Sequence, residues 1–99
     1  MIIEHTSENP VTLGKEPVLL DFYATWCGPC KMTGKYLEEF TSKHPEVTIY
    51  EINVDEYPDI TEKYSIMSLP TLIYLDTENE IWRHNGLMTT QMLEEKIYG

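Results

Sequence analysis

The 99-residue sequence contains only two cysteines, Cys27 and Cys30. Two cysteines cannot cross-link a small secreted scaffold with several disulfide bridges, so the fold must rely on an ordinary hydrophobic core. Apolar residues make up 41% of the sequence, which is typical of a globular protein and not of a disordered one. The cysteine pair is therefore of interest for its chemistry.

Basic residues are also scarce. Seven lysines and arginines stand against seventeen acidic residues, which gives a formal charge of −10. Such a chain lacks the positive surface that binds nucleic-acid backbones or anionic membranes. We expect neither nucleic acid nor a membrane among its partners, and a well solvated surface.

Long hydrophobic runs are absent. No stretch approaches the roughly 20 apolar residues of a membrane-spanning helix. Residues 1–5 contain no basic segment followed by an apolar core, so we expect no signal peptide and a cytoplasmic location. Structural disulfides are rare in the cytoplasm, and there a lone Cys-x-x-Cys pair is usually redox-active or metal-binding.

No internal repeat or linker divides the chain, so we expect a single domain over residues 1–99. Hydrophobic periodicity predicts five strands and three helices in the order β-β-α-β-α-β-β-α. The strands are expected at residues 1–5, 17–23, 47–54, 71–75 and 81–84, and the helices at 31–43, 55–64 and after 89. Asp55 and Thr89 are candidate N-caps. The order predicts an α/β fold, a mixed sheet with helices packed on its faces.

The cysteines lie where the second strand gives way to the first helix. With Cys27 as the N-cap, Gly28 and Pro29 occupy the first turn, where the missing N–H of proline costs nothing. The positive end of the helix favours a thiolate. We expect Cys27 to be exposed and Cys30 to lie one turn deeper. This arrangement predicts that Cys27 attacks a substrate disulfide and that Cys30 then attacks Cys27 to release the reduced product.

Zinc binding is the main alternative for a Cys-x-x-Cys pair. A structural zinc site needs two further ligands in tetrahedral geometry. The three histidines, His5, His44 and His84, are isolated in the sequence and have no metal-ligand spacing. The ligand count therefore argues against zinc.

Asp21 interrupts the apolar segment 18–22, which reads as a strand buried on both faces. A carboxylate there is costly unless it is paired or protonated. Its position near the base of the cysteine helix makes Asp21 a candidate proton acceptor for Cys30. An ordinary aspartate at the edge of the sheet remains the alternative, because strand periodicity alone does not fix its side.

Several motifs together resemble the thioredoxin family. Residues 21–31, Asp-Phe-Tyr-Ala-Thr-Trp-Cys-Gly-Pro-Cys-Lys, are similar to the thioredoxin active-site segment. The sequence features that follow in the family's order and spacing are Ile-Asn-Val-Asp at 52–55, Pro58, Tyr64, Leu-Pro-Thr at 69–71, and Gly86. The resemblance covers nearly the whole chain.

The resemblance implies a thioredoxin fold, with a five-stranded mixed sheet, about three flanking helices and a cis bond before Pro70. The segment before Cys27 is shorter than in typical members, so we expect the family's first helix to be truncated. The resemblance also implies that Cys27 is the nucleophile, Cys30 the resolving thiol and Asp21 a buried proton acceptor and donor. The implied substrate groove consists of Trp26, Gly28, Pro29, Leu69, Pro70 and Gly86.

The implied function is that of a general protein-disulfide reductase in electron transport and cell redox homeostasis. No cofactor would be bound, because thioredoxin reductase would restore the dithiol with electrons from NADPH. We expect disulfide-containing client proteins as partners, and a monomer. Two alternatives keep the fold: a module dedicated to one partner, and a non-catalytic binding subunit that uses the same groove.

Three departures from the family pattern surround the motif. Gly34 stands where the cysteine helix usually has a proline, and Asn79 replaces a common turn glycine, since asparagine tolerates left-handed geometry. Glu51 stands where many thioredoxins have a lysine close to the buried aspartate. If Glu51 approaches Asp21, it makes Asp21 harder to ionise, slows the deprotonation of Cys30 and alters the redox poise. Alternatively, Glu51 turns toward solvent.

Overall fold

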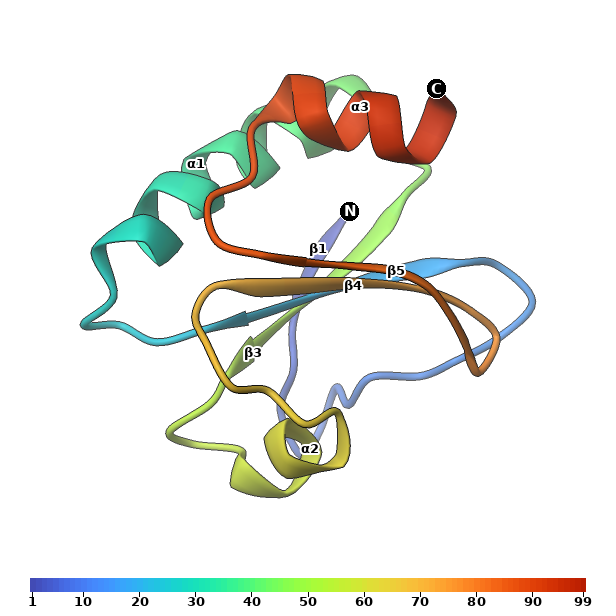
Figure 1. Ribbon diagram of the computed structural model, residues 1–99. Helices are drawn as coiled ribbons and strands as arrows, with labels where there is room; N and C mark the ends of the chain where they lie inside the picture. The colour runs from blue at the N-terminus through green and yellow to red at the C-terminus, as the bar shows by residue number, and fades with distance from the viewer.

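A five-stranded mixed sheet forms the centre of the molecule (Figure 1). The computed structural model describes residues 1–99. The strands are β1 (Ile2–Glu4), β2 (Val18–Tyr23), β3 (Thr48–Asn53), β4 (Thr71–Asp76) and β5 (Asn79–Asn85), in the spatial order β1-β3-β2-β4-β5. The pairs β1–β3 and β3–β2 are parallel, while β2–β4 and β4–β5 are antiparallel. The predicted element order and the mixed sheet are confirmed.

Three helices cover the two faces of this sheet. Helices α1 (Gly28–Lys43) and α3 (Thr90–Tyr98) lie together on one face, and α2 (Pro58–Lys63) lies on the other (Figure 1). Thr89 caps α3 as predicted, because its side chain accepts a hydrogen bond from the N–H of Met92. No helix forms between β1 and β2, so the first helix of the family is missing altogether.

Alternation along β2 divides the core between the two faces. Leu19 packs under α1 and α3 with Leu37, Phe40 and Ile49. Leu20 points to the opposite face. Asp21, two residues after Leu19, therefore faces α1, and β2 is the central strand of the sheet. The alternative of an edge aspartate is excluded.

The segment between β3 and α2 differs from prediction. We expected a helix over residues 55–64 capped by Asp55, but α2 begins at Pro58 with Tyr57 as an N-cap that makes no side-chain cap bond. Asn53 closes the preceding turn instead, because its side-chain oxygen accepts hydrogen bonds from the N–H groups of Asp55 and Glu56 at 3.0 and 3.3 Å. The side chain of Asp55 is thereby free to accept a hydrogen bond from the indole of Trp26.

The β4–β5 turn is also tighter than predicted. Only Thr77 and Glu78 lie between the strands, so the expected turn over residues 76–80 is too long. The left-handed position is Thr77, with φ of 53°, and not Asn79, which opens β5. The expectation for Asn79 was wrong because β5 begins two residues earlier than its apolar pattern indicates.

Replacing Gly34 with alanine is expected to stabilise the protein by roughly 0.5–1 kcal/mol, because an interior helical glycine costs that much against alanine. A Cβ at Gly34 would meet nothing within 4 Å. Gly86 is the matched control: its Cβ would also meet nothing, but its φ of +100° strains any other residue. Urea unfolding should show Gly34→Ala more stable and Gly86→Ala less stable. Equal shifts of the two variants would contradict this account.

Candidate active site

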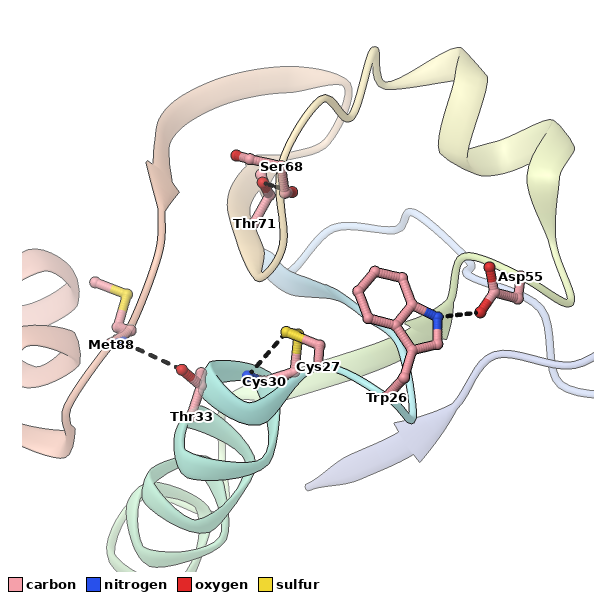
Figure 2. Close-up of a disulfide and its surroundings, with 8 residues drawn as sticks. All are labelled: Trp26, Cys27, Cys30, Thr33, Asp55, Ser68, Thr71 and Met88. Carbon is pink, nitrogen blue, oxygen red and sulfur yellow. Dashed lines mark hydrogen bonds between the residues drawn. A yellow bond between two sulfur atoms is a disulfide. The ribbon is translucent and has the colours of Figure 1, made fainter.

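Cys27 and Cys30 form a disulfide at the start of α1 (Figure 2). Cys27 is the N-cap in extended conformation, and its Sγ accepts a hydrogen bond from the N–H of Cys30 at 3.2 Å. Gly28 and Pro29 form the first turn between them. The Cα atoms of the two cysteines are 5.2 Å apart, within the usual range for a disulfide. The predicted cap position is confirmed, and it places Cys27 at the positive end of the helix.

The expected difference in exposure between the cysteines is not observed. Cys27 is 6% exposed and Cys30 is 5% exposed, so the disulfide form covers both residues. They differ instead in surroundings. Cys27 lines an apolar groove at the surface, and Cys30 lines a separate pocket beneath α1.

The apolar groove has a volume of about 340 Å³. Trp26 forms one wall with 70% of its surface exposed, and its Nε1 donates a hydrogen bond to Asp55 Oδ2 at 2.9 Å (Figure 2). Met67, which is 94% exposed, also lines the groove. The complete lining is Trp26, Cys27, Val54, Thr61, Ile66, Met67, Ser68 and Leu69.

The six groove residues named from the sequence fall into three groups. Trp26 and Leu69 line the groove, and Gly28 and Pro29 are exposed on the first turn of α1. Pro70, which is buried, and Gly86, which is half-buried, do not belong to the lining. The peptide bond before Pro70 is cis, as the resemblance implied, and the Pro70 carbonyl accepts a hydrogen bond from the N–H of Gly86 at 2.8 Å.

Sequence reasoning missed five groove residues. They are Val54, Thr61, Ile66, Met67 and Ser68. The adjacent apolar side chains of Ile66 and Met67, in a segment without strand or helix periodicity, were the available signal for a surface contact.

Asp21 lines the second pocket, which has a volume of about 300 Å³. The residue is only 2% exposed, and its Oδ1 is buried without a hydrogen-bond partner. Burial raises the pKa of Asp21 well above its usual value, and the charges of Glu51 and Glu4 raise it further. The pocket lining is Asp21, Tyr23, Ala24, Thr25, Cys30, Lys31, Gly34 and Glu51. Asp21 and Cys30 therefore share one pocket.

Glu51 lies beside Asp21 and does not turn away to solvent. The two residues are Cα partners in the parallel β2–β3 pair, and both line the pocket. Burial raises the pKa of Glu51 to about 7, with smaller contributions from Glu4 and Glu38. Of the two alternatives for Glu51, the structure therefore shows the approach to Asp21, and the charge of Glu51 acts to raise the pKa of Asp21.

Other titratable groups are engaged elsewhere. His5 Nδ1 accepts a hydrogen bond from the N–H of Val11, His44 Nε2 lies 2.8 Å from Glu94 Oε2, and His84 Nε2 lies 2.9 Å from the Leu87 carbonyl oxygen. No group of three or more histidine, cysteine or acidic side chains is arranged to hold a metal ion. None of the three helices is both long and apolar enough to cross a membrane.

A helix-capping disulfide beside a surface groove, on a mixed α/β sheet, is the site of a thiol–disulfide oxidoreductase, and comparison with known proteins agrees. A family model described as Thioredoxin matches residues 2–98. Thioredoxin from Alicyclobacillus acidocaldarius subsp. acidocaldarius is 42% identical over 85 residues, which are 85% of this chain and 81% of that protein. Thioredoxin from Chlamydia trachomatis serovar D is 46% identical over 80 residues, which are 81% of this chain and 78% of that protein.

The solved structures give the same result. The X-ray structure of Fasciola hepatica thioredoxin matches with a TM-score of 0.77 and 31% identity, covering 84% of this chain and 79% of that one. The chain belongs to the thioredoxin family. It is a thiol–disulfide oxidoreductase whose redox-active pair is Cys27 and Cys30.

Proposed function

We propose that this protein is a general reductant of protein disulfides in the cytoplasm, acting as a monomer. Its dithiol would be restored by thioredoxin reductase with electrons from NADPH, with no cofactor bound to this chain. The observation that carries the proposal is the separate placement of the cysteines: Cys27 opens to a groove for a client segment, and Cys30 opens to the pocket of Asp21.

The reaction has two steps of thiol–disulfide exchange. The Cys27 thiolate attacks one sulfur of a client disulfide, forming a mixed disulfide and releasing the other client sulfur as a thiolate. The Cys30 thiol then gives its proton to the Asp21 carboxylate and attacks Cys27 Sγ. The Cys27–Cys30 bond forms, and the second client sulfur leaves as a thiolate. Both client thiolates take protons from solvent, so the client gains two electrons that this chain loses.

The groove supports a broad range of clients. Its lining is mostly apolar, and its polar members, Thr61 and Ser68, carry no charge. Such a surface binds an extended segment through contact area and backbone groups, with little demand on the client's side chains. The roles of Trp26, Leu69, Pro70 and Gly86 as groove residues are part of this proposal.

Reduction of insulin disulfides with dithiothreitol tests the proposal. We expect the wild type to accelerate the reaction catalytically, because the dithiol returns after each turnover. A variant with Cys27 and Cys30 both replaced by serine should give only the background rate of dithiothreitol. Equal rates for the two proteins would favour the non-catalytic binding subunit. Turnover with one client among several unrelated disulfide proteins would favour the dedicated module.

A further inference from the structure

Three acidic residues lie in a row across adjacent strands of the sheet. Glu4 on β1 pairs with Glu51 on β3, and Glu51 pairs with Asp21 on β2. Neighbouring strands are about 4.8 Å apart, so the three side chains leave the sheet close together. They point to the α1 face, because Leu19 and Ile49, two positions before Asp21 and Glu51, pack beneath that helix.

The row runs from the interior to solvent. Asp21 is buried, Glu51 is half-buried and Glu4 is exposed. The buried Oδ1 of Asp21 has no protein partner, and both Asp21 and Glu51 line the pocket that contains Cys30. Tyr23 closes the outer end, since its hydroxyl donates a hydrogen bond to Glu4 Oε2 at 2.6 Å.

The charges that act on Glu51 come from Glu4 on β1 and Glu38 on α1, and both are negative. Lys31 is the one cation in the pocket lining, and it is exposed on the first turns of α1. The titratable and charged groups near the pair are Glu4 on β1, Tyr23 on β2, and Lys31 and Glu38 on α1, while the charge of Glu56 after β3 acts on Tyr23. Two neighbouring carboxyl groups in such a site do not readily ionise together, and they titrate as a pair that holds one proton over a wide pH range.

We propose that Glu51 carries the proton of the resolving step between the buried Asp21 and solvent. Glu51 acts through Asp21 and is in this sense a positioning residue. The proposal rests on the proposed roles of Cys30 and Asp21. It assigns to Glu51 a task that a lysine at this position could not perform in the same way, because an ammonium group has no free lone pair to accept a proton.

The transfer proceeds in balanced steps. The pair begins with one proton, which moves from Asp21 to the Glu51 carboxylate and leaves Asp21 ionised. The Cys30 thiol gives its proton to Asp21, and the resulting thiolate attacks Cys27 Sγ, so that the bond from Cys27 to the client breaks and the client sulfur leaves as a thiolate. Glu51 then releases its proton to solvent. One proton has left Cys30 and one has reached solvent, and the pair again holds one.

The field of Glu51 alone predicts the opposite effect on rate. A carboxylate beside Asp21 disfavours its ionisation, so removing that charge should make Asp21 a readier acceptor and speed the resolving step. A proton-carrying Glu51 predicts a slower step after the same change, because Asp21 would have to exchange its proton with solvent from a site that is only 2% exposed. A faster resolving step after the loss of the Glu51 charge would therefore indicate the effect of its field alone, and a slower step would indicate the proton-carrying role.

The experiment follows the reaction of the reduced protein with excess 5,5′-dithiobis(2-nitrobenzoate). Attack by Cys27 releases one coloured thiolate, and attack by Cys30 releases a second in a phase that does not depend on reagent concentration. In Glu51→Gln, we expect the second phase at pH 7 to slow by roughly ten- to hundredfold. This factor lies at or just below the lower end of the contribution of about 10²- to 10⁴-fold that a positioned proton-transfer group makes to a rate. The first phase should keep its rate, since Glu51 lies outside the Cys27 groove.

The pH profile provides a readout that a merely structural role would not change. In the wild type the second phase should rise with pH through a limb near pH 7, where Glu51 titrates. Glu51→Gln should lack this limb, and added imidazole should restore part of the lost rate. The matched control is Glu38→Gln, which removes an exposed carboxylate near Glu51 without altering the pocket lining. It should keep the rate of the second phase and its pH limb, with the limb moved to slightly lower pH because the charge of Glu38 helps to raise the pKa of Glu51.

The outcomes distinguish this inference from the function on which it rests. A faster second phase in Glu51→Gln, or a profile that coincides with the wild type, overturns the role of Glu51 alone. A second phase that persists in Cys30→Ser overturns the assignment of Cys30 and with it the proposed reductase mechanism.

Discussion

Replacing Cys30 with serine is expected to stop turnover and to leave the protein covalently bound to its client. The first attack uses only Cys27, which opens to the groove, so the mixed disulfide should still form. Its resolution needs the sulfur that lines the Asp21 pocket, and a serine hydroxyl does not attack a disulfide. Non-reducing electrophoresis and intact-mass measurement should show a nearly stoichiometric adduct that dithiothreitol releases.

Cys27→Ser is the matched control for this trap. It retains a cysteine, but that thiol lies in the pocket and away from the groove, so little adduct should form. Both single variants should lose insulin reduction to the background rate. Adducts on Cys27→Ser and none on Cys30→Ser would reverse the assigned roles, and the carboxylate pocket would then surround the attacking sulfur.

Replacing Asp21 with asparagine is expected to stabilise the folded protein by roughly 2 kcal/mol at pH 8, because the amide stays uncharged in a buried site where an uncompensated polar or charged group costs about 1–3 kcal/mol or more. Burial and the neighbouring Glu51 raise the pKa of the Asp21 carboxyl above its ordinary value of 3.8. The folded state therefore binds this proton more tightly than the unfolded state. The stability that protonated Asp21 contributes is fully present below its pKa in the unfolded state. This stability is lost as the pH rises through its pKa in the folded state. Asparagine has the same shape and does not titrate.

Urea unfolding of the disulfide form between pH 4 and pH 8 measures this effect. The free energy of unfolding of the wild type should fall as the pH rises, and Glu51 adds to the fall between its ordinary value of 4.5 and its raised pKa of about 7. Asp21→Asn should fall less, so that the gap between the two proteins widens with pH. Asp76→Asn is the control, because Asp76 is exposed at the end of β4. A wild-type curve that stays flat would contradict a raised pKa at Asp21.

Local sequence patterns predicted the parts of the fold that depend on neighbouring residues. The apolar run of β2, the helical stripe after Cys30 and the capping side chain of Thr89 all act within one or two turns of chain. The cap position of Cys27 could be predicted for the same reason. The burial of Asp21 followed from the apolar residues on both sides of it, since a strand buried on both faces leaves no exposed side.

Features that depend on three-dimensional arrangement could not be predicted in this way. Asp55 has the residue type of an N-cap, but the side chain of Asn53 closes the turn first and Asp55 binds Trp26. Cys27 and Cys30 are almost equally buried because they pack with Ala24 in one small cluster, although they line different cavities. The alignment of Glu51 with Asp21 depends on the register of β2 and β3, which periodicity alone leaves open.

The helices that border the groove are anchored in the core to different extents, and this affects the range of client segments that the groove can accept. The wall of the groove that contains Trp26 and Cys27 adjoins α1, whose inner side is anchored in the core by Leu37 and Phe40. Another wall comes from Thr61 of α2 and the loop after it, and this six-residue helix contains no fully buried side chain. Its contacts with the core come from half-buried side chains such as Ile60 and Ile66, and segments held in this way open locally at a lower free-energy cost than a fully buried core. One wall can therefore yield to clients of different bulk, while the cysteine pair keeps the geometry that exchange requires.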